Sequence, residues 1–330
     1  MRLLTVGTNE AGQRLDKLLA KYLNQAGKGF LYKMLRKKNI TLNGKKCDGS
    51  ERLKEGDEIG LFLADETIEK FCGSREPLSP TASKQPAGPP LSIVYEDDHI
   101  LLLNKPVGIL SQKAKETDIS MVEMVISYLL DSGQLREEEL KTFRPSVCNR
   151  LDRNTSGLIA AGKTLAGLQM LSRVLKDRTI QKYYLCIVAG CLKESRRVEG
   201  FLKKDEKTNR VTVFQSEVPG SSPIATSYVP LQENGRFTLL KVELLTGRTH
   251  QIRAHLASLG HPIAGDHKYG SPPVNEQLKK AYGISSQLLH SWKFIMPRTL
   301  DEPFTYLSGK EFTANLPEKF EKMAKAERLL

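Results

Sequence analysis

Residues 149–157 read Asn149-Arg150-Leu151-Asp152-Arg153-Asn154-Thr155-Ser156-Gly157, and an apolar run at 158–162 follows them directly. Asp152 stands between two arginines, and an opposite charge within a few ångströms keeps a carboxylate ionised. An ionised, oriented carboxylate can act as a nucleophile or as a general base near neutral pH. A lone aspartate more often caps a helix or lies solvated in a turn, so physics alone still favours an ordinary surface turn.

The same stretch resembles the signature Arg-Leu-Asp-x-x-Thr-Ser-Gly of the RluA family of RNA pseudouridine synthases, in which the aspartate is catalytic. The resemblance implies that Asp152 is the catalytic carboxylate and that Arg150 contacts the substrate. The family usually has a histidine before Arg-Leu-Asp, where this chain has Asn149. That departure leaves the carboxylate in place and affects only contacts specific to the histidine.

Two further segments resemble blocks of this family. Residues 99–108 resemble a strand that ends in Asn-Lys-Pro-x-Gly, which implies that Asn104 and Lys105 lie near the substrate. Lys105 either contacts phosphate or only closes the strand. Residues 182–184 resemble a Lys-x-Tyr pattern that selects Tyr184 over Tyr183, because neighbouring strand residues face opposite sides. The resemblance implies that Tyr184 stacks on the target uracil, with its hydroxyl available for proton transfer.

The longest match covers residues 245–270. It implies that Arg253 is the partner of Asp152, and a bidentate pair would hold that carboxylate ionised and aimed. It also places Arg248 and His250 in the substrate site, with Thr249 as a helix N-cap whose following amides could meet a phosphate. Residues 288–290 resemble the closing Leu-Leu-His strand of the family, in which Leu289 would pack beside the base. An ordinary core role for Leu289 is equally compatible.

Four histidines in residues 245–270 raise a metal hypothesis. His250 and His255 are five residues apart, which separates them by about 140° around a helix. They cannot share a face as the two histidines of a zinc helix do, and the stretch has no cysteine. Neither dinucleotide-binding nor P-loop glycine motifs occur. We therefore expect no metal and no nucleotide cofactor.

A small unit precedes these motifs, over residues 13–63. Leu15, Leu18, Leu19, Tyr22 and Leu23 follow helical spacing, and residues 30–35 repeat that pattern in a second helix. Residues 40–45 read as a strand entering an Asn-Gly turn, and a last strand ends near Leu63. The order resembles the αL-type RNA-binding module found in a small-subunit ribosomal protein and in many pseudouridine synthases.

Residues 28–46 of this unit carry seven lysines or arginines and no acid. A solvated helix face normally mixes the two signs, so a cluster of one sign favours phosphate contact with salt-sensitive binding. The resemblance implies that the second helix and the hairpin form the RNA surface. Its expected residues are Lys33, Arg36, Lys37, Lys38, Lys45 and Lys46.

The chain is thus predicted to be an α+β protein in three parts. Residues 1–63 form the αL-type module, and residues 64–91 are a proline-rich flexible linker. Residues 92–330 form the catalytic domain, with a mixed, largely antiparallel sheet flanked by helices. Helices are expected at 119–130, 165–175 and 248–259. Strands are expected at 92–95, 99–103, 158–161, 180–188, 210–215, 225–230, 237–244 and 287–294.

Composition agrees with a polyanionic partner. The 330 residues contain 50 Lys or Arg against 38 Asp or Glu, a formal net charge of +12. Neither a membrane-length apolar run nor a signal peptide is present, which makes the cytoplasm the expected location. The five cysteines are scattered without a C-x-x-C pair, so reduced thiols are expected.

The resemblance therefore implies isomerisation of uridine to pseudouridine, with the base flipped out of its stack. Large-subunit ribosomal RNA is the expected substrate and transfer RNA the alternative, and a monomer is the expected state. One rival is a non-catalytic RNA-binding or ribosome-assembly protein on the same scaffold. Another is an RNA hydrolase or glycosylase that uses Asp152 with water.

Overall fold

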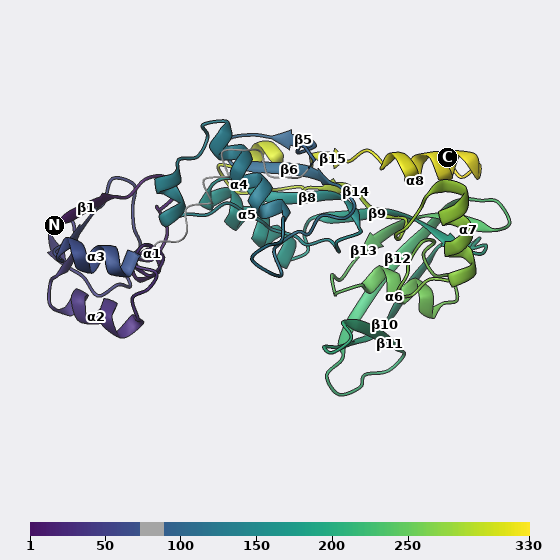
Figure 1. Ribbon diagram of the computed structural model, residues 1–330, viewed down its shortest axis with the longest axis horizontal. Helices are drawn as coiled ribbons and strands as arrows, with labels where there is room; N and C mark the ends of the chain where they lie inside the picture. Colours follow the sequence, from purple (N-terminus) through teal and green to yellow (C-terminus); the bar gives the residue numbers. More distant parts are fainter. Residues whose placement is uncertain (73–88) are drawn as a thin grey trace.

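The computed structural model describes residues 1–72 and 89–330 (Figure 1). Its N-terminal unit has a four-stranded antiparallel sheet in the order β1-β4-β2-β3. The Asn-Gly turn predicted after β2 is present, with positive φ at Asn43 (51°) and Gly44 (70°). The elements are β1 (Arg2–Thr5), α1 (Leu15–Tyr22), α2 (Lys28–Arg36), β2 (Ile40–Leu42), β3 (Lys45–Lys46), β4 (Glu58–Leu61) and α3 (Asp65–Cys72).

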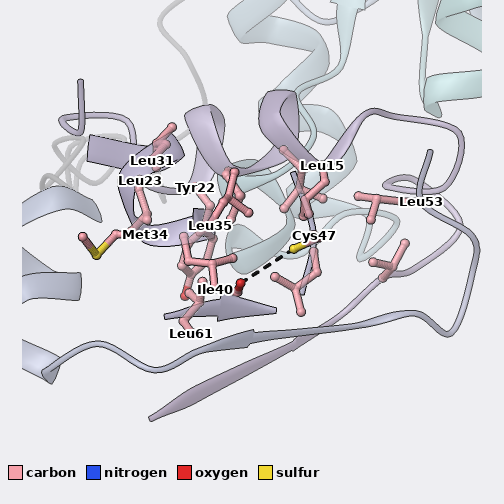
Figure 2. Packing of buried hydrophobic residues seen from close by; sticks show 14 of the residues in the cluster. Leu15, Tyr22, Leu23, Leu31, Met34, Leu35, Ile40, Cys47, Leu53 and Leu61 are labelled. Atoms are coloured by element: carbon pink, nitrogen blue, oxygen red, sulfur yellow. Dashed lines mark hydrogen bonds between the residues drawn. The ribbon is translucent and has the colours of Figure 1, made fainter. Parts of the chain in front are cut away.

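The apolar face predicted for the first helix does form the core of this unit. Leu15, Leu18 and Leu19 of α1 pack against Leu35 of α2 and Ile40 of β2, all fully or almost fully buried (Figure 2). Because the sheet covers only one side of the helices, the opposite face of α2 remains in solvent. The second predicted helix therefore buries Leu31, Met34 and Leu35 and exposes its cations.

Helix α3 is a correction to the predicted linker. Residues 64–91 are predicted to lack structure, but α3 occupies 65–72 and buries Ile68 completely in the N-terminal core. Phe71 lies 4.4 Å from Phe30, measured between ring centroids. The segment has only three apolar residues, Ile68, Phe71 and Cys72, which is too few for its periodicity to predict a helix. The remainder of the predicted linker, 73–88, lies outside the described residues.

The second part of the chain is built on one eleven-stranded sheet in the order β11-β10-β12-β13-β9-β14-β8-β6-β5, with β15 beside β14 and β7 beside β8. All of its strand pairs are antiparallel except β14 with β8. This is the mixed, largely antiparallel sheet that the sequence predicts. Its strands are β5 (Ile93–Glu96), β6 (Ile100–Lys105), β7 (Ser146–Val147), β8 (Ser156–Gly162), β9 (Gln181–Ala189), β10 (Arg196–Asp205), β11 (Arg210–Phe214), β12 (Ser222–Glu233), β13 (Phe237–Leu244), β14 (Leu289–Ile295) and β15 (Glu311–Thr313).

Helices cover both faces of this sheet. Alternate residues of β6 and β8 face opposite ways, so Leu101 and Leu103 pack on α4 while Ile100 and Leu102 pack on α5. Helix α6 packs over β9, β13 and β14, and the last two helices cover their other face. The helices are α4 (Met121–Asp131), α5 (Leu165–Lys176), α6 (Gln251–Ser258), α7 (Pro272–Tyr282) and α8 (Glu318–Ala326).

Five of these elements are absent from the sequence prediction, namely the short strands β7 and β15 together with β10, α7 and α8. Strand β10 exposes Arg196, Arg197 and Glu199 and so reads as a polar loop. Helix α7 begins with two prolines, which is permitted at a helix start but resembles a turn in sequence. Helix α8 has charged residues on most of its surface and buries Phe320, Met323 and Ala324.

Candidate active site

Asp152 lies on the wall of a cavity of about 800 Å³. The loop at 148–155 forms one side of this cavity, and β9 with the segment 247–253 forms the other. Tyr184 and Leu289, from the neighbouring strands β9 and β14, complete its apolar part. The cavity therefore lies next to the place where β8 and β14 run parallel.

The loop that carries Asp152 is held by Asn149 and Ser111. The Asn149 amide donates to the carbonyl of Leu158 (3.2 Å) and accepts from the N–H of Ala160 (2.8 Å), so it fastens the loop to β8. The Ser111 hydroxyl donates to the carbonyl of Leu151 and accepts from its N–H, both at 2.9 Å. Asn149, where the family usually has histidine, is thus a structural clamp on the loop.

Gly157 explains the glycine of the signature. Its φ is +105°, and a Cβ there would lie 2.2 Å from the carbonyl oxygen of Ser291. Only glycine lets β8 approach β14 this closely. The Ser156 hydroxyl adds a hydrogen bond across the same pair, to Nδ1 of His290 at 2.9 Å.

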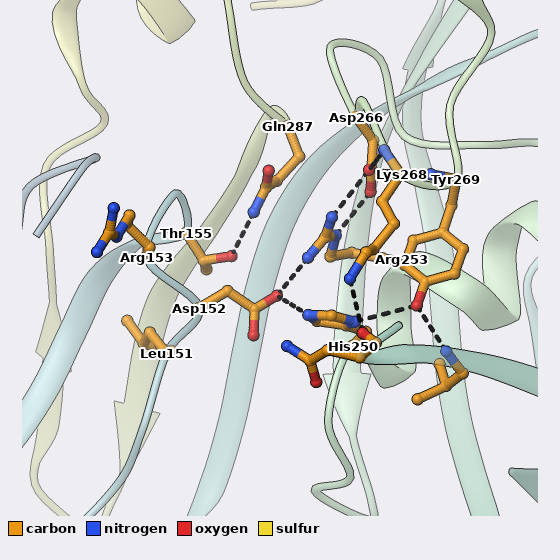
Figure 3. Close-up of polar contacts among 12 residues, drawn as sticks. Leu151, Asp152, Arg153, Thr155, His250, Arg253, Asp266, Lys268, Tyr269 and Gln287 are labelled. Atoms are coloured by element: carbon orange, nitrogen blue, oxygen red, sulfur yellow. Dashed lines mark hydrogen bonds and ion pairs between the residues drawn. The ribbon is translucent and has the colours of Figure 1, made fainter. Parts of the chain in front are cut away.

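Arg253 connects two carboxylates (Figure 3). Its Nη1 donates to Oδ2 of Asp152 at 2.7 Å, which confirms the predicted contact. The bidentate pair, however, is with Asp266, through Nε at 2.7 Å and Nη2 at 2.9 Å, so the prediction of a bidentate pair with Asp152 is wrong. The buried Asp266 orients the guanidinium through Nε and Nη2, and Nη1 then aims Asp152.

Both buried partners are held in their charged forms. Burial disfavours the charge of Arg253, but its bonds to Asp266 and its attraction to Asp152 outweigh this and raise the pKa of the guanidinium. Burial would likewise raise the pKa of Asp266. The bonds from Arg253 and from the backbone N–H groups of Lys268 and Tyr269 lower that pKa instead. The result is a fixed positive charge beneath Asp152.

His250 also faces Asp152, from a left-handed backbone conformation with φ of 52°. It is the residue before α6, so the prediction of Thr249 as the N-cap is wrong by one position, and the His250 side chain makes no capping bond. The Tyr269 hydroxyl accepts from the N–H of Val211 and lies 3.0 Å from Nδ1 of His250. We therefore assign the ring proton to Nε2, which lies 3.9 Å from Oδ2 of Asp152.

Tyr184 and Leu289 form the apolar wall. Both are nearly buried and pack in one cluster with Leu151, beside Asp152. Tyr183 points away from the cavity, and Leu288 packs in a different cluster with α7 and α8. Burial raises the pKa of Tyr184 to about 12, and the negative charge of Asp152 adds to this effect. The tyrosine is thus a neutral ring near pH 7, suited to stacking.

Asn104 and Lys105, predicted near the substrate, make structural contacts instead, and for Lys105 this agrees with the strand-closing role that the sequence also allows. Lys105 is fully buried, and its Nζ donates to the carbonyls of Pro106, Ile109 and Arg153 at 2.7–3.0 Å. Burial lowers its pKa to about 7, against the pull of Asp152. The Asn104 amide donates to the carbonyl of Asn315. Neither residue lines the cavity, because strand β6 ends behind the Asp152 loop.

The cavity wall is strongly basic. Asp152 is its one carboxylate, whereas seven lysines or arginines line it in addition to Arg253. Arg150 and Arg248, predicted from the sequence, are among the seven. The other five were not predicted, since the sequence does not show which distant segments a cation lies against. The seven are Arg150, Arg153, Lys176, Arg178, Lys182, Lys204 and Arg248.

The predicted RNA surface of the N-terminal unit is also exposed. All six cations named there lie in solvent, on α2, in the turn after it and on β3. Over residues 1–72 and 89–330, none of the six forms an ion pair. Their charge is available to a ligand.

Comparison with known proteins decides the family. Residues 99–258 match the family described as RNA pseudouridylate synthase, and residues 13–59 match the S4 domain. The Ribosomal large subunit pseudouridine synthase C of Vibrio cholerae serotype O1 is 31% identical over 297 residues, which cover 88% of this chain and 87% of the relative. The chain belongs to the RNA pseudouridylate synthase family. It is therefore an isomerase that acts on RNA, and the resemblance to the RluA family is confirmed.

Other relatives in this family have similar coverage. The synthase C of Escherichia coli (strain K12) is 30% identical over 91% of this chain and 90% of its own length. The Ribosomal large subunit pseudouridine synthase D of Nitrosomonas europaea is 30% identical over 88% of this chain and 78% of its own. The solved structure of Human RNA Pseudouridylate Synthase Domain Containing 4 has a TM-score of 0.57 at 18% identity, over 72% of this chain and 93% of that one. It shows the same fold.

The described residues contain neither a cluster of metal ligands nor a membrane-spanning helix. No three histidine, cysteine or acidic side chains gather there as metal ligands would. No helix in that part of the chain is long and apolar enough to cross a bilayer.

Proposed function

We propose that this chain converts specific uridines of large-subunit ribosomal RNA to pseudouridine, with Asp152 as the catalytic carboxylate. The observation that carries the proposal is the position of Asp152, which Arg253 orients in a basic cavity that Tyr184 and Leu289 also line. The relatives named as large-subunit synthases support the choice of RNA. We propose that the enzyme acts as a monomer and that, with a ribosomal substrate, it works in the cytoplasm.

The geometry assigns different tasks to the two oxygens of Asp152. Oδ2 accepts from Arg253 and faces His250, whereas no hydrogen bond within the described residues reaches Oδ1. Oδ1 is therefore the oxygen that meets the substrate. A uracil in the cavity would have left its stack, and Tyr184 and Leu289 would replace the neighbouring bases.

The reaction needs only these groups. The bond between N1 of uracil and C1′ of ribose breaks, and a bond between C5 and C1′ forms. C5 loses a proton and N1 gains one, so neither a reductant nor an external group donor takes part. We propose that Arg150, Arg248 and His250 contact the substrate around this centre, since all three line the cavity.

We further propose that the N-terminal unit anchors the RNA and that residues 92–330 perform the chemistry. The division rests on the separate hydrophobic core of residues 6–68 and on the basic surface of α2 and β3. With α3 included, the anchoring unit extends beyond residue 63, the boundary predicted from the sequence.

The test is tritium release from ribosomal and transfer RNA labelled at C5 of uracil. Wild type should release tritium from large-subunit RNA, and Asp152→Asn should release none while it binds that RNA within about twofold, because the substitution keeps the shape and removes the ionised oxygen. Asp131→Asn, an exposed residue at the end of α4 and away from the cavity, is the matched control and should behave as wild type.

Each other outcome has a definite meaning. Release by Asp152→Asn at the wild-type rate would remove Asp152 from the mechanism. Release from transfer RNA alone would correct the substrate. Free uracil or cleaved chains in place of an isomer of unchanged mass would identify a glycosylase or hydrolase.

A further inference from the structure

Lys182 lies on β9 two residues before Tyr184, so both side chains face the same side of the sheet and both line the cavity. The lysine is half-buried. Its ammonium has no hydrogen-bond acceptor and no carboxylate within contact among residues 1–72 and 89–330. A lysine that only filled space in the fold would be satisfied by the protein, as Lys105 is by three carbonyls.

Arg178 places a second positive charge beside Lys182. It lies in the turn between α5 and β9, in a left-handed conformation with φ of 58°, and lines the same part of the cavity. Burial lowers the pKa of Lys182, and the charge of Arg178 lowers it further. Two neighbouring cations without an acid repel each other, and a bound anion would remove that cost.

The position of Lys182 identifies the anion. Lys182 and Tyr184 are two residues apart on β9, a separation of about 6.8 Å, which is similar to the length of one nucleotide. Tyr184 is the residue that faces the target base. We propose that Lys182, with Arg178, binds the phosphodiester next to the target uridine. This assignment rests on the proposed function, since it takes RNA as the ligand and Tyr184 as the stacking residue. A lysine suits the task because it binds phosphate as a point charge.

The test is a double-mutant cycle on RNA affinity, which combines a change in the protein with a change in the RNA and needs no catalysis. The probe is a short single-stranded RNA with one central uridine among cytidines, bound by the Asp152→Asn enzyme. A neutral methylphosphonate replaces each phosphate beside the uridine in turn. One replacement should weaken binding about tenfold, the cost of one charge-assisted bond, and should have no effect once Lys182→Met is also present. The same substitution should reduce the slope of log Kd against log salt concentration by about 0.7.

Controls separate this role from a general loss of charge or fold. Lys182→Arg should keep the methylphosphonate effect, and Lys193→Met, on the exposed segment after β9, should leave it unchanged. If Lys182→Met is unfolded by circular dichroism, Arg178→Gln, at an exposed position, replaces it in the cycle. Equal methylphosphonate effects with and without the cation, or no effect in either, overturn the proposal. Tritium release by wild type tests the proposed function separately.

Discussion

Arg253 serves two acids of different exposure. Asp266 is fully buried and binds the guanidinium through two nitrogens, while Asp152 is partly exposed and receives one. Because a buried charge without a partner is costly, the Arg253–Asp266 pair can hold only one arrangement. The Nη1–H group of Arg253 therefore has a fixed direction, and its bond fixes the position of the Asp152 carboxylate although that residue lies on a loop.

This arrangement predicts the effect of Asp266→Ala. The substitution leaves Arg253 buried with one partner, so we expect the free energy of unfolding to fall by about 3–5 kcal/mol and kcat to fall with it. Urea unfolding and tritium release measure the two effects. Asp301→Ala removes an acid from an exposed pair with Arg173 (2.8 Å) and should cost less than about 1 kcal/mol. Equal stability of the two variants would contradict the argument.

The sequence predicts some residues of the site and not others, for physical reasons. The signature places Asp152, and strand alternation selects Tyr184, because both depend on local spacing. The partner of a charged side chain depends instead on where distant segments meet. Asp266 lies within the matching stretch 245–270 without a predicted role, and Lys105 bonds to the carbonyl of the distant Arg153. Lys182 belongs to the Lys-x-Tyr pattern, but its lack of a partner among the described residues is seen only in the structure.

At the scale of elements, α2 and β3 carry exposed cations of the N-terminal unit. Helix α2 packs Leu31, Met34 and Leu35 inward, so its cations cannot turn toward the core. No acid between residues 28 and 46 compensates these cations. A surface of this kind releases counterions from RNA when it binds.

The corresponding prediction concerns Lys33, Arg36, Lys37 and Lys38. Neutralising all four with glutamine should weaken RNA binding and reduce the slope of log Kd against log salt by about 0.7–0.9 for each phosphate that the variant no longer neutralises. The matched control neutralises four exposed cations at the other end of the chain, Lys319, Lys322, Lys325 and Arg328, with the same change in net charge. Equal slopes in the two variants would show that only net charge matters.

Element prediction succeeds where one face is apolar and fails where it is not. Strand β13 (Phe237–Leu244) is found because it begins with a continuous run of buried residues, and helix α5 because its buried positions follow the helical period. Strand β10 is an inner strand of the sheet, yet its exposed side is charged. Helix α3 is stabilised by packing on Phe30 and the N-terminal core, which no local window shows.

At the scale of the whole molecule, the parallel pair of β8 and β14 joins the two groups of strands in the large sheet. Strands β5–β8 lie on one side of this pairing and β9–β13 on the other, with the active site above it. His290, fully buried on β14, joins the two sides. Its Nδ1 accepts from Ser156 of β8, and its Nε2 faces the carbonyl of Ala314 at 3.2 Å. A carbonyl accepts only, so Nε2 carries the proton and the ring is neutral.

The buried His290 predicts how the free energy of unfolding depends on pH. Burial lowers the pKa of His290 from 6.5 to about 4, against the pull of the Ala314 carbonyl. Between these values the unfolded chain binds a proton that the folded chain does not, so the stability due to the neutral ring is complete above pH 6.5 and is lost as the pH falls toward 4. A shift of this size corresponds to roughly 3 kcal/mol.

Urea unfolding at about pH 7, 5.5 and 4.5 should show this loss of stability, and His290→Gln should make the free energy of unfolding less dependent on pH. The exposed His267→Gln is the control and should retain the wild-type slope. A slope that His290→Gln leaves unchanged would assign the acid sensitivity to other groups, such as the buried His255, whose pKa burial also lowers.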